Sequence, residues 1–248
     1  MYDIKQHKDD VFTIDNFLNE DECKRIIDYL EMSVQNDYIK WNQISFYESY
    51  AMGFWEYDNN LIPFGFDPKY FHSLKEKIKN AGEICFNNKL SEISYHAQKW
   101  TEGAFAGFHS DNSDEHGNPT AFQRSKYAIF LYLNDNFDGG NLNFEHYPIN
   151  IKPKTGMISI FKGGYKNEHE VTTVKNGERY TIGSFWDDAD AVYTDEEKAK
   201  WEVELKGIRS EQDLMYKKWE QDRQNGIIPT YKSKYEKEKN AWVTSIKE

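Results

Sequence analysis

Residues 127–133 read Tyr127-Ala128-Ile129-Phe130-Leu131-Tyr132-Leu133, a β-branched and aromatic run that ends in the turn sequence Asn134-Asp135. Such a run, bounded by turn residues, is typical of a buried β-strand. Shorter runs of the same kind follow at 141–145, 156–161, 169–174 and 179–186, with glycine-containing turns between them. Short strands at this spacing predict an antiparallel jelly roll or barrel as the core of a β-rich α+β protein.

Helical patterns precede this strand region. Asn19 is followed by three acidic residues and then by an apolar stripe at Ile26, Ile27 and Leu30. An Asn at the cap and acids in the first turn are N-terminal helix signals. We therefore expect a helix that begins near Asn19 and a second supporting helix near 69–86.

The last part of the chain, 187–248, is denser in charged residues than the part before it. Thr194 and Glu197 have the spacing of a capping box, and Ser210 opens a second helical pattern. We expect one main domain over 1–186 and a charged helical C-terminal extension over 187–248, packed on the domain or appended to it.

Composition limits the classes of partner. The 42 acidic and 31 basic residues give a net charge of −11, which repels nucleic acid in the absence of a basic stripe, and the sequence contains no such stripe. No run approaches the ~18 apolar residues of a membrane span, and the N-terminus lacks the apolar stretch of a signal peptide. We expect no nucleic-acid partner, no membrane association and a cytoplasmic location.

Two His-x-Asp triplets are present. His7-Lys8-Asp9 lies outside the strand region and is interpreted as chance, whereas His109-Ser110-Asp111 lies at its edge. Residues two apart in a strand face the same side, so His109 and Asp111 can converge on one point.

A third ligand would have to come from another strand. His169 opens the predicted strand 169–174 directly after a glycine turn. Taken alone it is most simply a surface histidine. Together with His109 and Asp111 it makes two imidazoles and one carboxylate, the facial triad of non-haem Fe(II) oxygenases.

Arg179 begins the next predicted strand, with Thr181 two residues later. In a protein of net negative charge, a site for a dicarboxylate needs a dedicated cation, and a guanidinium binds a carboxylate through two hydrogen bonds. We interpret Arg179 and Thr181 as an anion site.

The sequence contains the motifs His109-x-Asp111, Tyr132-Leu133-Asn134, Gly139-Gly140-Asn141-Leu142-Asn143-Phe144, 156–161, His169-Glu170-Val171 and Asn176-Gly177-Glu178-Arg179-Tyr180-Thr181. Together these motifs resemble the 2-oxoglutarate/Fe(II) oxygenase superfamily, and within it the prolyl 4-hydroxylase-like branch. They cover about 95–186, and residues 12–18 with the helix after them resemble the N-terminal segment of that branch.

The resemblance implies a double-stranded β-helix (jelly roll, cupin-like) as the core, with His109, Asp111 and His169 on Fe(II). It implies that Arg179 binds the far carboxylate of 2-oxoglutarate, with Tyr132 assisting it and Thr181 as the small hydroxyl residue. The family has a tyrosine in the strand before His-x-Asp where this sequence has Trp100. The usual aromatic residue three positions before the histidine is Ala106, and collagen-type members have lysine at position 179.

The function that the resemblance implies is a dioxygenase that uses Fe(II), 2-oxoglutarate and O2 to hydroxylate a C–H bond, with succinate and CO2 as coproducts. The favoured substrate is a peptidyl proline, so the expected partner is a peptide or protein, and ascorbate is a candidate additional cofactor. The alternatives are an oxygenase for a free amino acid or another small molecule, and a non-oxygenase cupin-type barrel that binds a metal or sugar.

An aromatic segment at 38–57 is interpreted either as a substrate lid or as core. The sequence does not set the oligomeric state.

Overall fold

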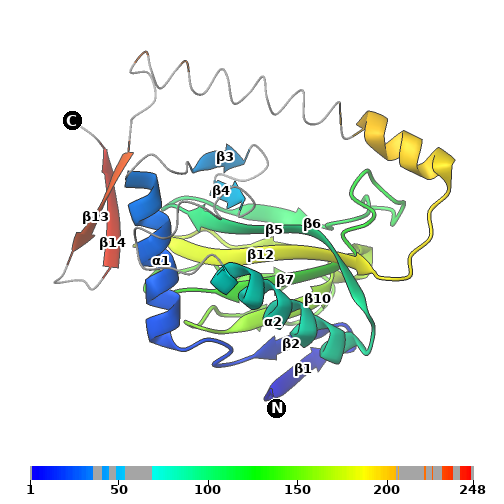
Figure 1. Ribbon diagram of the computed structural model, residues 1–248, viewed down its shortest axis with the longest axis horizontal. Coiled ribbons are helices and arrows are strands. Elements are labelled where there is room, and N and C mark those ends of the chain that lie inside the picture. The colour runs from blue at the N-terminus through cyan, green and yellow to red at the C-terminus, as the bar shows by residue number, and fades with distance from the viewer. Residues whose placement is uncertain are drawn as a thin grey trace.

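The computed structural model describes residues 2–35, 41–44, 49–53, 69–204, 206, 221, 225, 231–236 and 241–246. Two antiparallel sheets form the body of the protein, and two helices lie against the larger one (Figure 1). The coarse prediction of a β-rich antiparallel core with N-terminal supporting helices is therefore confirmed. None of the helices in the described ranges combines the length and the apolar character that a membrane crossing requires.

The larger sheet has eight strands, and each of them pairs antiparallel with its neighbours. In spatial order they are β1 (Ile4–Lys8), β2 (Val11–Ile14), β10 (Ile158–Lys162), β7 (Tyr127–Tyr132), β12 (Arg179–Asp188), β5 (Leu90–Trp100), β4 (Ser49–Gly53) and β3 (Asn42–Ile44). The quoted stretch from Tyr127 thus forms β7, near the middle of this sheet. The smaller sheet has four strands, β6 (Ala106–His109), β11 (His169–Val171), β8 (Leu142–Phe144) and β9 (Asn150–Ile151). The strands expected near 141, 156, 169 and 179 are all present.

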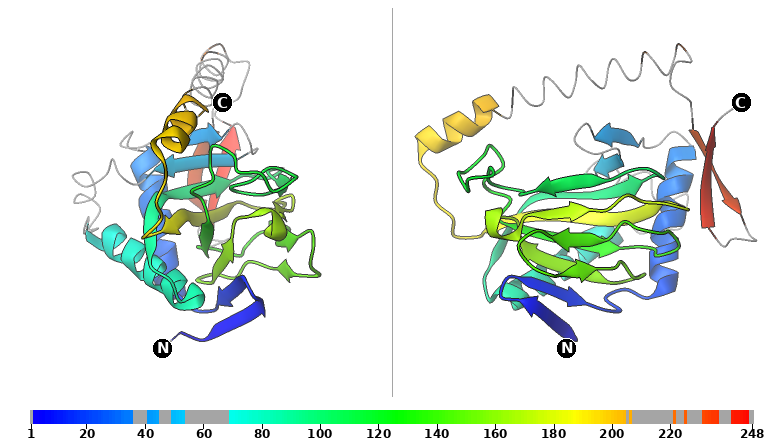
Figure 2. Two further views of the ribbon diagram at one scale, coloured as in Figure 1. Left: turned by 90° about the vertical axis from the view of Figure 1, so that its right-hand side faces the viewer. Right: turned by 180° about the vertical axis from the view of Figure 1, so that it is seen from behind.

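The larger sheet is apolar on both faces. On one face, alternate residues such as Ile129 and Ile182 pack in one cluster with α1 (Glu20–Gln35) and α2 (Lys69–Phe86). On the other face, Tyr132 and Phe161 pack with Phe144 of the smaller sheet. Figure 2 shows the helices and the smaller sheet on opposite sides of the larger sheet. The period-two alternation of β12 therefore directs Arg179 and Thr181 toward the smaller sheet.

The start of α1 follows from the predicted cap. The Glu22 backbone N–H donates to Asn19 Oδ1 at 2.8 Å, and the Asn19 N–H donates to Glu22 Oε2 at 3.0 Å. This reciprocal pair satisfies two N–H groups that the first helical turn leaves without intrahelical partners. The second expected helix is α2, with the predicted bounds.

The C-terminal extension is only partly helical. Residues 195–204 form a helix, and the Glu197 N–H donates to Thr194 Oγ1 at 3.2 Å as the capping box requires. The extension then ends in two paired strands, β13 (Tyr231–Glu236) and β14 (Ala241–Ile246), so the prediction of a helical tail is wrong there. These two segments are rich in aromatic and β-branched residues, which favour strands. The second helix expected from Ser210 lies outside the described residues.

The aromatic segment 38–57 also lies mostly outside the described residues. Trp41 is the one of its aromatic side chains that the structure describes. It is half-buried, and its indole N–H donates to Glu31 Oε1 of α1 at 3.2 Å.

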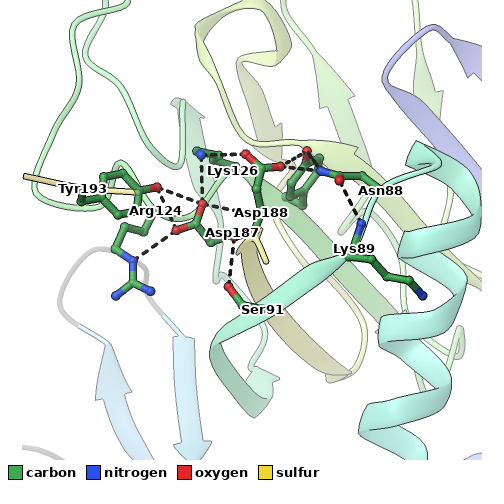
Figure 3. A network of polar contacts seen from close by, with 9 residues as sticks. Asn88, Lys89, Ser91, Arg124, Lys126, Asp187, Asp188 and Tyr193 are labelled. Atoms are coloured by element: carbon green, nitrogen blue, oxygen red, sulfur yellow. Dashed lines mark hydrogen bonds and ion pairs between the residues drawn. The ribbon is translucent and has the colours of Figure 1, made fainter. Parts of the chain in front are cut away.

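A polar network holds the end of β12 (Figure 3). The Asp187 carboxylate is 1% exposed and accepts from Arg124 Nε at 3.2 Å and from the Tyr193 hydroxyl at 2.8 Å. Lys126 Nζ lies 3.0 Å from Asp187 Oδ1 and 2.7 Å from Asp188 Oδ2. The network ties the loop before β7 and the start of the C-terminal extension to the main domain.

We expect Asp187→Ala to lower the free energy of unfolding by about 1–3 kcal/mol, because it leaves several donors without their charged acceptor. Urea denaturation measures this effect. Asp15→Ala is the matched control, because the Asp15–Lys154 pair is solvent-exposed and such pairs contribute less than about 1 kcal/mol. Equal losses in both variants would contradict a stabilising role for the network.

Candidate metal centre

The three predicted ligands converge on one point between the sheets. In the register of β6 and β11, His109 is the cross-strand partner of His169, and Asp111 follows two residues after His109. One ligand atom from each of the three residues lies within 4.8 Å of the other two. The structure therefore brings together side chains that are 60 residues apart in the sequence.

Backbone carbonyls orient both imidazoles. His109 Nδ1 lies 2.7 Å from the Gly107 carbonyl oxygen, and His169 Nδ1 lies 3.0 Å from that of Asn167. A carbonyl can only accept, so each Nδ1 carries the hydrogen. Each Nε2 is then the lone-pair atom, and these atoms lie 3.9 and 3.8 Å from Asp111 Oδ1. This tautomer is the one that a metal-binding histidine needs.

Burial sets the charges of this group. Burial, with a further contribution from His109, lowers the pKa of His169 to about 3, and burial also lowers the pKa of His109. Burial raises the pKa of Asp111 to about 8. Among the described residues, Asp111 Oδ2 has no hydrogen-bond partner although it is buried. Neutral imidazoles beside an unsatisfied carboxylate fit a divalent cation, which would supply the missing partner.

Arg179 forms the second part of the site. Its side chain is 2% exposed, and its guanidinium carbon lies 5.0 Å from the Trp100 ring and 5.2 Å from the Tyr132 ring. Nε and Nη1 have no hydrogen-bond partner within the described part of the chain. Burial lowers the pKa of Arg179, while Tyr132 acts in the opposite direction. A buried guanidinium with unused donors fits an anionic ligand.

The comparisons with known proteins agree with this geometry. Residues 95–187 match the family model described as the 2OG-Fe(II) oxygenase superfamily. This part of the chain is therefore similar to that superfamily. The matched range runs from the middle of β5 to the end of β12 and includes the triad and Arg179.

Among curated proteins, this chain is similar to prolyl 3-hydroxylase 2 of Mus musculus, with 34% identity over 85 residues. That match covers 32% of this chain and 12% of the relative, so the chain spans about one eighth of the protein that it resembles.

Two solved structures show the same fold. A prolyl hydroxylase of Trichoplax adhaerens, in complex with a hypoxia-inducible factor peptide fragment, has a TM-score of 0.54 at 20% identity, over 73% of this chain and 84% of that one. The viral collagen prolyl hydroxylase of Paramecium Bursaria Chlorella virus-1 has a TM-score of 0.51 at 20% identity, over 72% of this chain and 96% of that one.

The candidate metal centre also depends on a glycine that the sequence analysis did not single out. The carbonyl oxygen of Gly163 accepts from the Asp111 backbone N–H at 2.8 Å. A Cβ on Gly163 would lie 2.7 Å from Asp111 Oδ2 and 2.8 Å from the Ser125 carbonyl oxygen. The signal in the sequence was the Gly163-Gly164 pair directly after a strand, which was interpreted only as a turn.

The remaining predicted residues line the same interior. The Tyr132 hydroxyl lies 3.1 Å from Ser159 Oγ, and Thr181 Oγ1 donates to Gln98 Oε1 at 3.1 Å. The His169 ring packs on Phe161 at 4.7 Å between centroids, and Phe161 belongs to the same apolar cluster as Tyr132. Gln98 is a second site-lining residue that the sequence analysis missed, because a glutamine in a strand carries no distinctive signal.

Proposed function

We propose that this chain is an Fe(II)- and 2-oxoglutarate-dependent dioxygenase that hydroxylates a peptidyl proline and releases succinate and CO2. The observation that carries the proposal is the combination of the His109–Asp111–His169 triad with the buried Nε and Nη1 donors of Arg179, which have no partner among the described residues. A cupin-type sugar or metal site has no fixed need for such a guanidinium. We infer further that the two sheets form a double-stranded β-helix and that the oxygenase domain is 1–186.

The residues have separate tasks in this proposal. His109, Asp111 and His169 would hold Fe(II). Bound Fe(II) would activate O2, which is the oxidant, and 2-oxoglutarate would give two of the electrons, a redox chemistry that the side chains of the protein lack. The apolar packing of Phe161 and Phe144 around His169 excludes water from one side of the centre.

Arg179 would bind the far carboxylate of 2-oxoglutarate. Its planar donors match a carboxylate, and the rings of Trp100 and Tyr132 hold the guanidinium from two sides. Tyr132 and Thr181 lie opposite each other in the register of β7 and β12, so both belong to the same part of the interior.

The peptidyl substrate is supported by the relatives. Both the curated relative and the two solved structures are prolyl hydroxylases, and one of them holds a peptide. A proline-rich peptide is pre-ordered as polyproline II, which lowers the entropy lost on binding. Ascorbate as an additional cofactor and a cytoplasmic location stay predictions.

The test is a turnover assay with Fe(II), 2-oxoglutarate and ascorbate on a panel of proline-containing peptides, free proline and methylated oligonucleotides. We expect succinate formation and the gain of one oxygen atom by a peptide, detected by mass spectrometry. Oxygen gain confined to free proline, or oligonucleotide demethylation, would contradict the peptidyl substrate and leave the oxygenase class intact. Absence of succinate with every substrate would contradict the class.

Gly163→Ala is expected to weaken metal binding at least about tenfold, the lower end of the cost of disturbing groups that orient metal ligands. The added Cβ would collide with Asp111, as described above. Titration of the protein with Mn(II) measures the affinity. Gly107→Ala is the control, because a Cβ there meets no atom within 4 Å although its carbonyl also orients a ligand. Equal Mn(II) affinities of Gly163→Ala and Gly107→Ala would contradict the prediction, because they would show that a displaced Asp111 still binds the metal.

A further inference from the structure

Gln98 is a buried polar residue among the side chains assigned above to 2-oxoglutarate. It is 4% exposed and lies on β5 directly opposite Thr181 of β12. Thr181 in turn lies opposite Tyr132 of β7. The amide of Gln98 is therefore part of the same face of the larger sheet as the predicted anion site.

The hydrogen bonds of this amide fix its orientation. Gln98 Oε1 accepts from Trp100 Nε1 at 3.3 Å and from Thr181 Oγ1 at 3.1 Å. An indole N–H can only donate, so the atom that faces it is the amide oxygen. The other end, Gln98 Nε2, lies 3.1 Å from His96 Nε2. Burial lowers the pKa of His96 to about 4, so this ring is neutral and accepts the amide hydrogen.

The bond to Trp100 acts on the anion site. The Trp100 ring lies against the Arg179 guanidinium at 5.0 Å, and this contact depends on how the indole is turned. Trp100 and Arg179 are also cross-strand partners, so the strands bring the two residues together but do not set the ring plane. The hydrogen bond from the indole to Gln98 sets the plane of the Trp100 ring.

The bond from Thr181 holds the amide of Gln98 in place. The Thr181 hydroxyl has one hydrogen, which it donates to Gln98 Oε1. The amide oxygen that accepts from the Trp100 indole is therefore also held from β12.

We propose that Gln98 is a positioning residue of the 2-oxoglutarate site, which holds the Trp100 indole against Arg179. This inference rests on the proposed function, because it assumes that Arg179 binds the cosubstrate. It adds a residue that acts on cosubstrate affinity through its neighbours.

The test is calorimetric titration of the Mn(II)-loaded protein with 2-oxoglutarate. Gln98→Met keeps the length of the side chain and removes its hydrogen bonds. We expect Kd to rise about tenfold, the size expected for one lost hydrogen bond with ordinary net energy. In the Fe(II) enzyme we expect the KM for 2-oxoglutarate to rise by the same factor, with kcat at saturation unchanged.

Ser184→Ala is the matched control. Trp186 Nε1 donates to Ser184 Oγ at 2.8 Å, so here too an indole donates to a side chain two residues earlier on the same strand. This pair lies on the helix-facing side of the larger sheet. A merely structural role of Gln98 would give the same result as this control, a lower melting temperature with an unchanged Kd. That result would overturn the proposal.

Trp100→Phe removes the indole N–H and keeps an aromatic ring. We expect it to raise Kd, and adding Gln98→Met to it should change Kd by less than about twofold, because coupled residues are not additive. Full additivity would overturn a role through Trp100. If Gln98→Met does not fold, Trp100→Phe is the test of the proposal. An unchanged Kd for 2-oxoglutarate in Trp100→Phe would overturn it.

Two further titrations separate this inference from the proposed function. If the wild-type protein does not bind 2-oxoglutarate, the proposed function fails. The other case is that the wild type binds 2-oxoglutarate, Arg179→Ala does not, and Gln98→Met binds it as tightly as the wild type. The proposed function then stands, and only the role assigned to Gln98 is wrong.

Discussion

His169→Ala is expected to abolish Fe(II)-dependent succinate formation. His169 is 3% exposed, its ring is held by the Asn167 carbonyl and the Phe161 ring, and its Nε2 faces Asp111. Loss of an outer-shell partner of a metal ligand already costs about 10–100-fold in affinity, so loss of the ligand itself should exceed that range. Metal titration and a succinate assay measure the two effects separately.

His7→Ala and His116→Ala are the controls for this variant. His7 Nε2 lies 2.9 Å from Thr13 Oγ1 and His116 Nε2 lies 3.6 Å from Glu115 Oε1, and neither histidine belongs to the triad. We expect metal affinity and succinate formation at wild-type levels in both. Normal activity of His169→Ala would remove it from the ligand set, and activity lost equally in all three variants would indicate a general loss of folding.

The sequence was sufficient to predict most of the core, because its strands carry period-two patterns and glycine turns. The reason for placing Asp111 next to His109 was only partly right. β6 ends at His109, so Asp111 lies beyond the strand and is held by a hydrogen bond to the Gly163 carbonyl. Strand alternation indicated the right neighbours, while a loop contact between distant residues fixes the carboxylate.

Other features depend on contacts that a single sequence does not contain. Gln98 and Thr181 are 83 positions apart, and only the pairing of β5 with β12 makes them partners. The strands β13 and β14 were missed because the dense charges of 187–248 were given more weight than the aromatic and β-branched residues near the end of the chain. Helical periodicity was clear only in the first part of that extension.

Arg179→Ala is expected to raise the KM for 2-oxoglutarate at least about tenfold, since a charge-assisted hydrogen bond contributes about 1.5–3 kcal/mol. The buried position favours the upper end of this range, because a carboxylate that enters the site loses its water and Arg179 holds the unpaired donors. Tyr132→Phe should have a smaller effect, about 1 kcal/mol, because the ring that contacts the guanidinium remains. Titration of each variant with 2-oxoglutarate in the succinate assay gives KM and kcat.

Arg124→Ala is the matched control, because Arg124 is a partly exposed arginine that pairs with Asp187 in the network of Figure 3. We expect it to lower stability and leave the KM unchanged. Arg179→Lys keeps the charge but loses the planar pair of donors, so its KM should lie between those of the wild type and Arg179→Ala. An unchanged KM in Arg179→Ala would place the anion site elsewhere. A raised KM with kcat retained at saturation would show that Arg179 acts on binding of the cosubstrate rather than on the chemical step.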